Sequence, residues 1–183
     1  MISGNKSRRE GGGLDPSGGV LSVTNTTISG NHSAKGGGIQ TESNSVVTLV
    51  NVTIAQNKAR EGAGLWTEAG STVTLTNTLV AKNAPFDCFG PVTSGGSNLI
   101  GKVDGCGISG DATGNQLGGP RPLRALDPRI GPLTNNGGPT KTHALLAGSP
   151  AIDAVLGTCP PPAADQRGLP RSGACDIGAF ELQ

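Results

Sequence analysis

The feature that most constrains this chain is an internal repeat in its N-terminal half. Segments 1–26, 27–52 and 53–78 align without a net gap, and a fourth repeat begins at Leu79. A fixed period of this length is typical of chains that stack one structural unit on the next. The aligned asparagines form two rows, Asn5, Asn31, Asn57 and Asn83 in one and Asn25, Asn51 and Asn77 in the other.

Each repeat is expected to contain short strands. Residues 46–50 and 72–76 are rich in β-branched side chains and alternate with a period of two. Further short strands are expected around Ile28 and Ile54 and at 64–67. Three short strands in every repeat predict an all-β fold, a right-handed parallel β-helix whose coils each hold one repeat.

The aligned positions then receive structural roles. Aliphatic rows such as Leu21, Val47 and Val73 are expected to point inward and form a thin core. The two asparagine rows are expected at bends, because asparagine tolerates a left-handed backbone and its amide can bond to the next asparagine in a ladder. The recurring glycines predict bends or close approach of neighbouring backbones.

The period fails from about Ala84 onward. We expect residues 1–83 to form the repeating coils and residues 84–183 to form one last coil and a loop-rich C-terminal cap. The two parts are expected to make one continuous structural unit, because the last coil of a stack needs cover for its open edge.

The C-terminal half contains seven short motifs in order, at 97–101, 127–133, 136–140, 143–146, 148–154, 165–168 and 175–181. Together they resemble a known family, the choice-of-anchor Q domain of bacterial surface and secreted proteins, and the repeats resemble the right-handed parallel β-helix that precedes it there. That resemblance implies an exported bacterial protein at the cell surface or outside the cell, and it implies no known reaction.

Four cysteines in an apparently exported chain indicate two disulfides. Of the three possible pairings, we favour the sequential one, Cys88–Cys106 and Cys159–Cys175, in which each bond closes a short loop. A zinc site built from all four cysteines is the alternative, although no pair has the usual two-residue spacing.

Charged residues cluster in the family-like motifs of the cap. A functional interpretation makes them a metal or sugar site, with His143 nearby in sequence. We favour a structural network that holds the cap together, since buried charges must be paired. Its members are Asp153, Asp165, Arg167 and Asp176, with Glu181 beside them.

Two rows of charged residues in the repeats are further candidates. Glu42 and Glu68 are one repeat apart, so they are expected to stack on the exterior, where they could bind Ca²⁺ or act as an acid/base pair. Solvated surface charge is the simpler interpretation. Lys6, His32 and Lys58 stack in the same way beside an asparagine row.

Composition narrows the class of partner. A net charge of +1 and 2% aromatic residues disfavour nucleic-acid binding, and no apolar run is long enough for a membrane span. Glycans remain candidate partners. The first coil is expected to present an open edge, which predicts either upstream coils of a longer parent chain or end-to-end self-assembly.

We therefore expect a non-enzymatic, exported structural protein used for adhesion, scaffolding or filament assembly. No catalytic residue and no required cofactor is assigned. The alternative is a carbohydrate-active enzyme on the same fold, a polysaccharide lyase or a glycoside hydrolase, which would need an exterior groove lined by several acids and a base.

Overall fold

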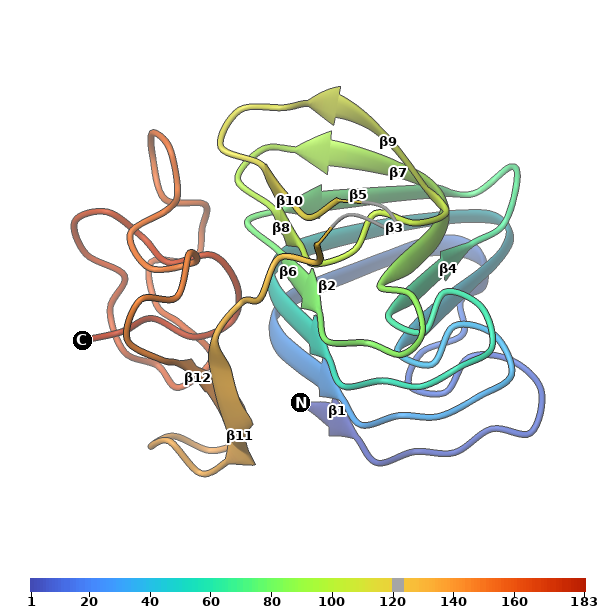
Figure 1. Cartoon of the computed structure of the whole chain (residues 1–183), viewed down its shortest axis with the longest axis horizontal. Helices are drawn as coiled ribbons and strands as arrows, with labels where there is room; N and C mark the ends of the chain where they lie inside the picture. The colour runs from blue at the N-terminus through green and yellow to red at the C-terminus, as the bar shows by residue number, and fades with distance from the viewer. Residues whose placement is uncertain (120–123) are drawn as a thin grey trace.

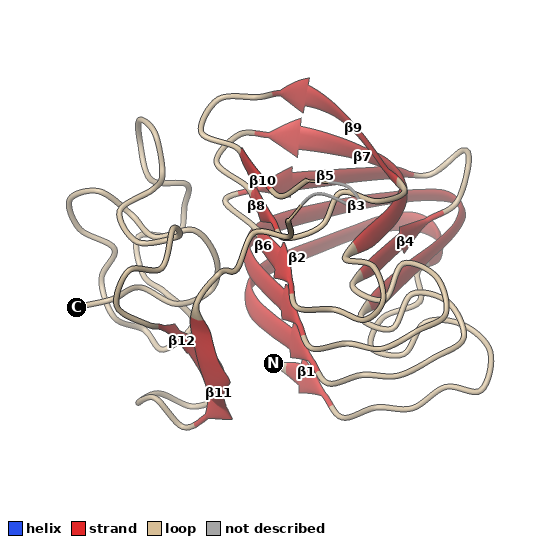
Figure 2. Cartoon of the chain, viewed as in Figure 1, coloured by secondary structure: helices blue, strands red, loops and turns tan. Residues whose placement is uncertain are grey.

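The computed structural model describes residues 1–119 and 124–183, which form strands, turns and loops without a helix (Figure 2). Within these ranges, ten strands form one sheet, and two form a separate antiparallel hairpin. No helix among the described residues is long and apolar enough to cross a membrane. The strands are β1 (Ile2–Ser3), β2 (Ser17–Ser29), β3 (Ile39–Ala55), β4 (Leu65–Thr67), β5 (Thr72–Thr76), β6 (Leu79–Ala81), β7 (Cys88–Gly95), β8 (Leu99–Ile100), β9 (Cys106–Asp111), β10 (Gln116–Leu117), β11 (Ile130–Thr134) and β12 (Thr142–Leu145).

The first strands pair in the register that the sequence repeat sets, so equivalent residues of successive repeats lie opposite one another. β2 lies parallel to β3 with Leu21 opposite Val47, and β3 lies parallel to β5 with Val47 opposite Val73. Ile54 of β3 pairs in the same way with Val80 of β6. Equivalent side chains of successive repeats are therefore direct neighbours across the sheet.

The prediction of a right-handed parallel β-helix with three short strands in each coil is wrong. The pairings β3–β4, β4–β7, β7–β5 and β5–β3 return to their starting strand, so these four parallel strands close a barrel. The other strands of the sheet are bonded outside this barrel. The fold class is all-β with two disulfides.

The physical reason for the difference lies in the length of β2 and β3, which have 13 and 17 residues. Asn25 and Asn51 have positive φ angles of 44° and 55°. Each takes up a bend inside a strand, so the strand continues where a break was expected. Through this length β3 pairs with β2, β4, β5 and β6.

The core consists of the predicted aliphatic rows. Val47, Val73, Leu49 and Leu75 are all at most 1% exposed, and Leu21 at the edge is partly buried against them. A recurring glycine patch lets the backbones come close, since a Cβ at Gly38 would lie 2.5 Å from the carbonyl oxygen of Gly64. Side chains larger than hydrogen are excluded there.

The segment after β12 packs against one side of the sheet and, in residues 146–183, contains no strand (Figure 1). Leu79 of β6 and Leu99 of β8 form a second apolar cluster with Ile177 and Phe180. Four strands that follow residue 83, β7 to β10, belong to the same ten-stranded sheet as the repeats. The division at residue 83, like end-to-end assembly through the first repeat, stays a prediction.

Candidate functional site

One asparagine row forms a continuous ladder of side-chain amides. The Nδ2 of Asn5 donates to Oδ1 of Asn31 at 2.9 Å, and the same bond joins Asn31 to Asn57 and Asn57 to Asn83 at 3.0 Å. Each backbone amide donates to the same acceptor oxygen. The ladder ends on Asp87, whose Oδ1 accepts from Asn83 at 2.9 Å.

Asp87 was not identified from the sequence, although it is the acceptor that completes the ladder. Its carboxyl is fully buried. Burial raises the pKa of Asp87 from 3.8 to about 6, opposed by the hydrogen bonds from Asn83 and by Lys102. The only signal for it in the sequence is an acidic residue four positions after the last asparagine of the row.

The second asparagine row works differently, because it connects the repeats to the C-terminal segment. Asn77 donates to Oδ1 of Asn51 at 2.7 Å and to the carbonyl of Asp176 at 3.1 Å. Asn25 donates to the carbonyl of Ala164 at 2.6 Å. These side chains therefore anchor a segment that lies far away in the sequence.

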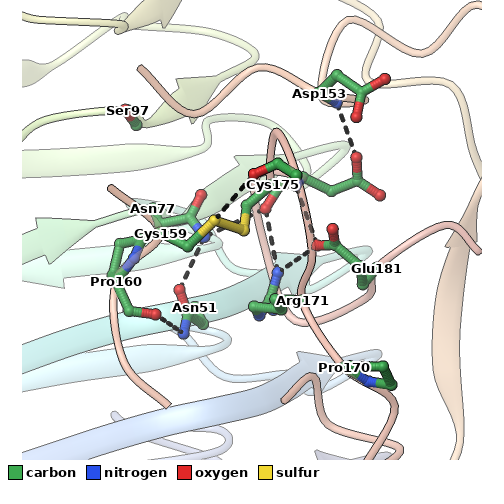
Figure 3. The surroundings of a disulfide bond; sticks show 12 residues. Asn51, Asn77, Ser97, Asp153, Cys159, Pro160, Pro170, Arg171, Cys175 and Glu181 are labelled. Carbon is green, nitrogen blue, oxygen red and sulfur yellow. Dashed lines mark hydrogen bonds and ion pairs between the residues drawn. A yellow bond between two sulfur atoms is a disulfide. The ribbon is translucent and has the colours of Figure 1, made fainter. Parts of the chain in front are cut away.

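Both disulfides have the sequential pairing, Cys88–Cys106 and Cys159–Cys175. The first joins β7 to the start of β9. The second lies beside Asn51 and Asn77 and close to the ion pair of Arg171 and Glu181 (Figure 3). No cysteine is left free, so the four-cysteine zinc site is excluded.

Buried ion pairs hold the C-terminal segment together. Arg167 Nε lies 2.8 Å from Asp165 Oδ2, and Arg171 Nη1 lies 2.8 Å from Glu181 Oε2. Arg167 also donates to the carbonyl of Glu181 and stacks on the ring of Phe180. Arg171 was missed by sequence reasoning, because no motif or period marks it.

Asp176 accepts backbone hydrogen bonds from Asp153 at 2.8 Å and Leu182 at 2.5 Å. Burial raises the pKa of Asp176. The side chain of Asp153 is exposed, so this residue joins the network through its backbone. Burial likewise raises the pKa of Glu181 and lowers that of Arg171.

His143 is brought next to a serine that the sequence does not connect with it. Its Nε2 lies 2.9 Å from Ser29 Oγ, and its Nδ1 lies 2.7 Å from the carbonyl of Gly131. The carbonyl requires a proton on Nδ1, so Nε2 accepts from the serine. Both side chains are 1% exposed, and burial lowers the pKa of His143. The pair therefore connects β2 to the hairpin out of reach of a substrate.

The exterior of β3 and β4 carries a hollow of about 320 Å³. Glu42 and Glu68 line it together with Gln40 and Trp66, and Lys35 lies 4.9 Å from the centre of the Trp66 ring. Ser43 donates to Glu68 at 2.9 Å. The stacking of the two carboxylates on one face thus follows from the register.

Asp15 is close enough to Glu42 and Glu10, which line this hollow, to interact with their charges. Desolvation, followed by the negative charges of Glu42 and Glu10, raises the pKa of Asp15. Within residues 1–119 and 124–183, no three His, Cys, Asp or Glu side chains are grouped so that they could hold a metal ion. Binding of Ca²⁺ by Glu42 and Glu68 stays a prediction.

No family model, curated protein or solved structure matches this chain. The resemblance to the choice-of-anchor Q domain therefore stays an expectation.

Proposed function

We propose that this protein is a non-enzymatic structural protein that works outside the cell, exported by a bacterium as the resemblance implies. One observation carries the proposal: the buried asparagines of the repeats and the buried charged side chains of the C-terminal segment are hydrogen-bonded or ion-paired within the protein. The asparagine ladder crosses four repeats and ends on Asp87. A rigid scaffold needs such continuous hydrogen bonding between its layers.

The C-terminal segment supports the same proposal. Two buried ion pairs, Arg167–Asp165 and Arg171–Glu181, use carboxylates that an enzyme could otherwise use as acid or base. The disulfide Cys159–Cys175 closes the segment beside them. Two disulfides fit an oxidising environment, in which they form and persist.

The location can be tested in the cells that produce the protein. Intact cells are treated with trypsin and a membrane-impermeant maleimide, and the protein is then examined by mass spectrometry. We expect a protein that is released or cut from outside, with both disulfides formed and no labelled thiol. A protein in the cytoplasmic fraction that trypsin has not cut, and whose four thiols react with maleimide only after the cells are lysed, would contradict the proposal.

One observation favours a second candidate, a carbohydrate-active enzyme. Asp15 lies near Glu42 and Glu10, and desolvation together with their charges raises its pKa. Glycoside hydrolysis uses two carboxyl groups whose environments separate their pKa values. This candidate predicts cleavage of a polysaccharide that is lost in Asp15→Asn and kept in Asp111→Asn, an exposed control. Absence of cleavage from a broad polysaccharide panel would remove it.

A further inference from the structure

The side of the repeats that carries the loops after β1, β2 and β3 has a second hollow, larger than the acidic one. These loops run side by side in Figure 1, and isolated parallel bridges join Lys6 to His32 and His32 to Lys58. The hollow has a volume of about 500 Å³. Its cationic lining consists of Arg8, Lys58 and Arg60, and His32 lies among them.

The repeat explains why a hollow forms at this place. Arg8, Ala34 and Arg60 occupy the same position in three successive repeats. Adjacent repeats lie about 4.8 Å apart, so the two arginines stand about 10 Å apart with the small Ala34 between them. Because the side chain of Ala34 is short, it leaves an empty space that forms the floor of the hollow. Arg8 and Arg60 line the hollow on either side of it.

The positive charge of this hollow is not neutralised by the protein. Within the described residues, no Asp or Glu side chain lines it, and none of its arginines or its lysine takes part in an ion pair. By contrast, Lys35 of the neighbouring hollow lies 3.7 Å from Glu10. Exposed cations that converge without partners create a field that attracts an anion.

We propose that this basic hollow binds an acidic polysaccharide, one that carries carboxylate or sulfate groups along its chain. The cations come from the first and the third repeat, on either side of Ala34, which fits a linear ligand with several charges better than a single small anion. Guanidinium groups bind carboxylate and sulfate oxygens through paired hydrogen bonds. The volume of the hollow, about 500 Å³, lies in the range of ligand-binding pockets and can hold a short stretch of polymer.

Two observations favour a saccharide over nucleic acid. In the part of the chain that the structure describes, no aromatic side chain on which a base could stack lines the hollow. The two disulfides fit an oxidising compartment, where glycans are the common polyanions; this choice rests on the proposed extracellular location. The presence of the anion site itself does not depend on that location.

The test measures binding of the purified oxidised protein to immobilised polymers by surface plasmon resonance. The probes are polygalacturonate for carboxylate, heparin for sulfate, dextran as a neutral polymer, a single-stranded oligonucleotide, and vesicles with anionic phospholipid. We expect salt-sensitive binding to polygalacturonate or heparin and none to dextran. Stronger binding to the oligonucleotide or the vesicles would overturn the assignment to a saccharide.

Variants locate the site. Arg8→Ala with Arg60→Ala should weaken binding at least tenfold, whereas Arg124→Ala with Lys141→Ala removes two exposed cations elsewhere and should change it less than twofold. Ala34→Leu fills the floor without altering charge and should also weaken binding at least tenfold. Thermal melting verifies that each variant is folded. Equal losses in the two double variants, or unchanged binding by Ala34→Leu, would overturn the proposal.

Discussion

The side-chain amide of Asn83 donates to Oδ1 of Asp87 at 2.9 Å, and the backbone amide of Asn83 donates to the same oxygen at 2.9 Å. The asparagine ladder thus ends on a buried carboxylate, which accepts the last two hydrogen bonds of the ladder and carries a negative charge when it is ionised. This combination makes Asp87 a site where stability depends on pH.

We predict that Asp87→Asn stabilises the protein at neutral pH. The pKa of Asp87 is about 6 in the folded state against 3.8 ordinarily, so its contribution to stability is full below about pH 4 and is lost as the pH rises through about 6. Asparagine keeps the acceptor without the charge. The gain at pH 7.5 should be on the order of 1–3 kcal/mol.

Urea unfolding of both proteins between pH 4 and 8 measures this. The difference in unfolding free energy should grow with pH and level off above about 7. Asp111→Asn is a control with the opposite sign, because hydrogen bonds from Thr113 lower the pKa of that exposed carboxyl. A variant Asp87→Asn that is less stable than the parent at pH 7.5 would contradict the prediction.

We predict that Asn51→Leu destabilises the protein by about 2–4 kcal/mol. Asn51 has a φ of 55° and accepts from Asn77, so leucine adds backbone strain and leaves the buried Asn77 amide without one of its acceptors. Asn51→Gly relieves the strain alone and should cost less. Thermal melting compares the two, and equal melting temperatures of Asn51→Leu and the parent would refute the role of this bend.

We predict that the disulfide Cys159–Cys175 stabilises the C-terminal segment more than it stabilises the sheet. It closes a loop across 16 residues, which is worth about 3 kcal/mol in the unfolded-chain account. In the double variant Cys159→Ala with Cys175→Ala, hydrogen exchange should accelerate in 152–183 and stay slow in β3 and β5. Loss of protection in β3 at the same rate would show that segment and sheet unfold together.

We predict that Arg171→Met costs about 3–5 kcal/mol, because it leaves the buried Glu181 without its partner at 2.8 Å. The double variant Arg171→Met with Glu181→Leu should recover most of that loss, since the carboxylate of Glu181 is then no longer buried without its cation. Chemical unfolding of the single and double variants measures the difference. If the double variant is no more stable than Arg171→Met, the penalty does not come from the unpaired carboxylate.

Much of the local pairing could be predicted from the sequence, because the period of the repeat determines which side chains become neighbours. Leu21, Val47 and Val73 stand opposite one another for that reason. The closed barrel could not be predicted, since positive φ at Asn25 and Asn51 allows long strands to bend and continue. Repeat spacing alone does not distinguish a bend inside a strand from a break.

The contacts of the C-terminal segment were harder to predict. The disulfide pairing follows from short loops between neighbouring cysteines, and Asp165 with Arg167 follows from charges in one motif. The Ser29–His143 bond depends on how distant segments pack, and the Arg171–Glu181 pair depends on how the C-terminal loop folds back on itself. No local pattern in the sequence records such packing.

The most direct test of the account incubates the folded protein with polygalacturonate and heparin and follows two signals in one sample. Bound polymer is measured by co-sedimentation, and cleavage is measured by new reducing ends. We expect bound polymer that depends on Arg8 and Arg60, with no new reducing ends over many hours. New reducing ends that disappear in Asp15→Asn would contradict it and identify an enzyme instead.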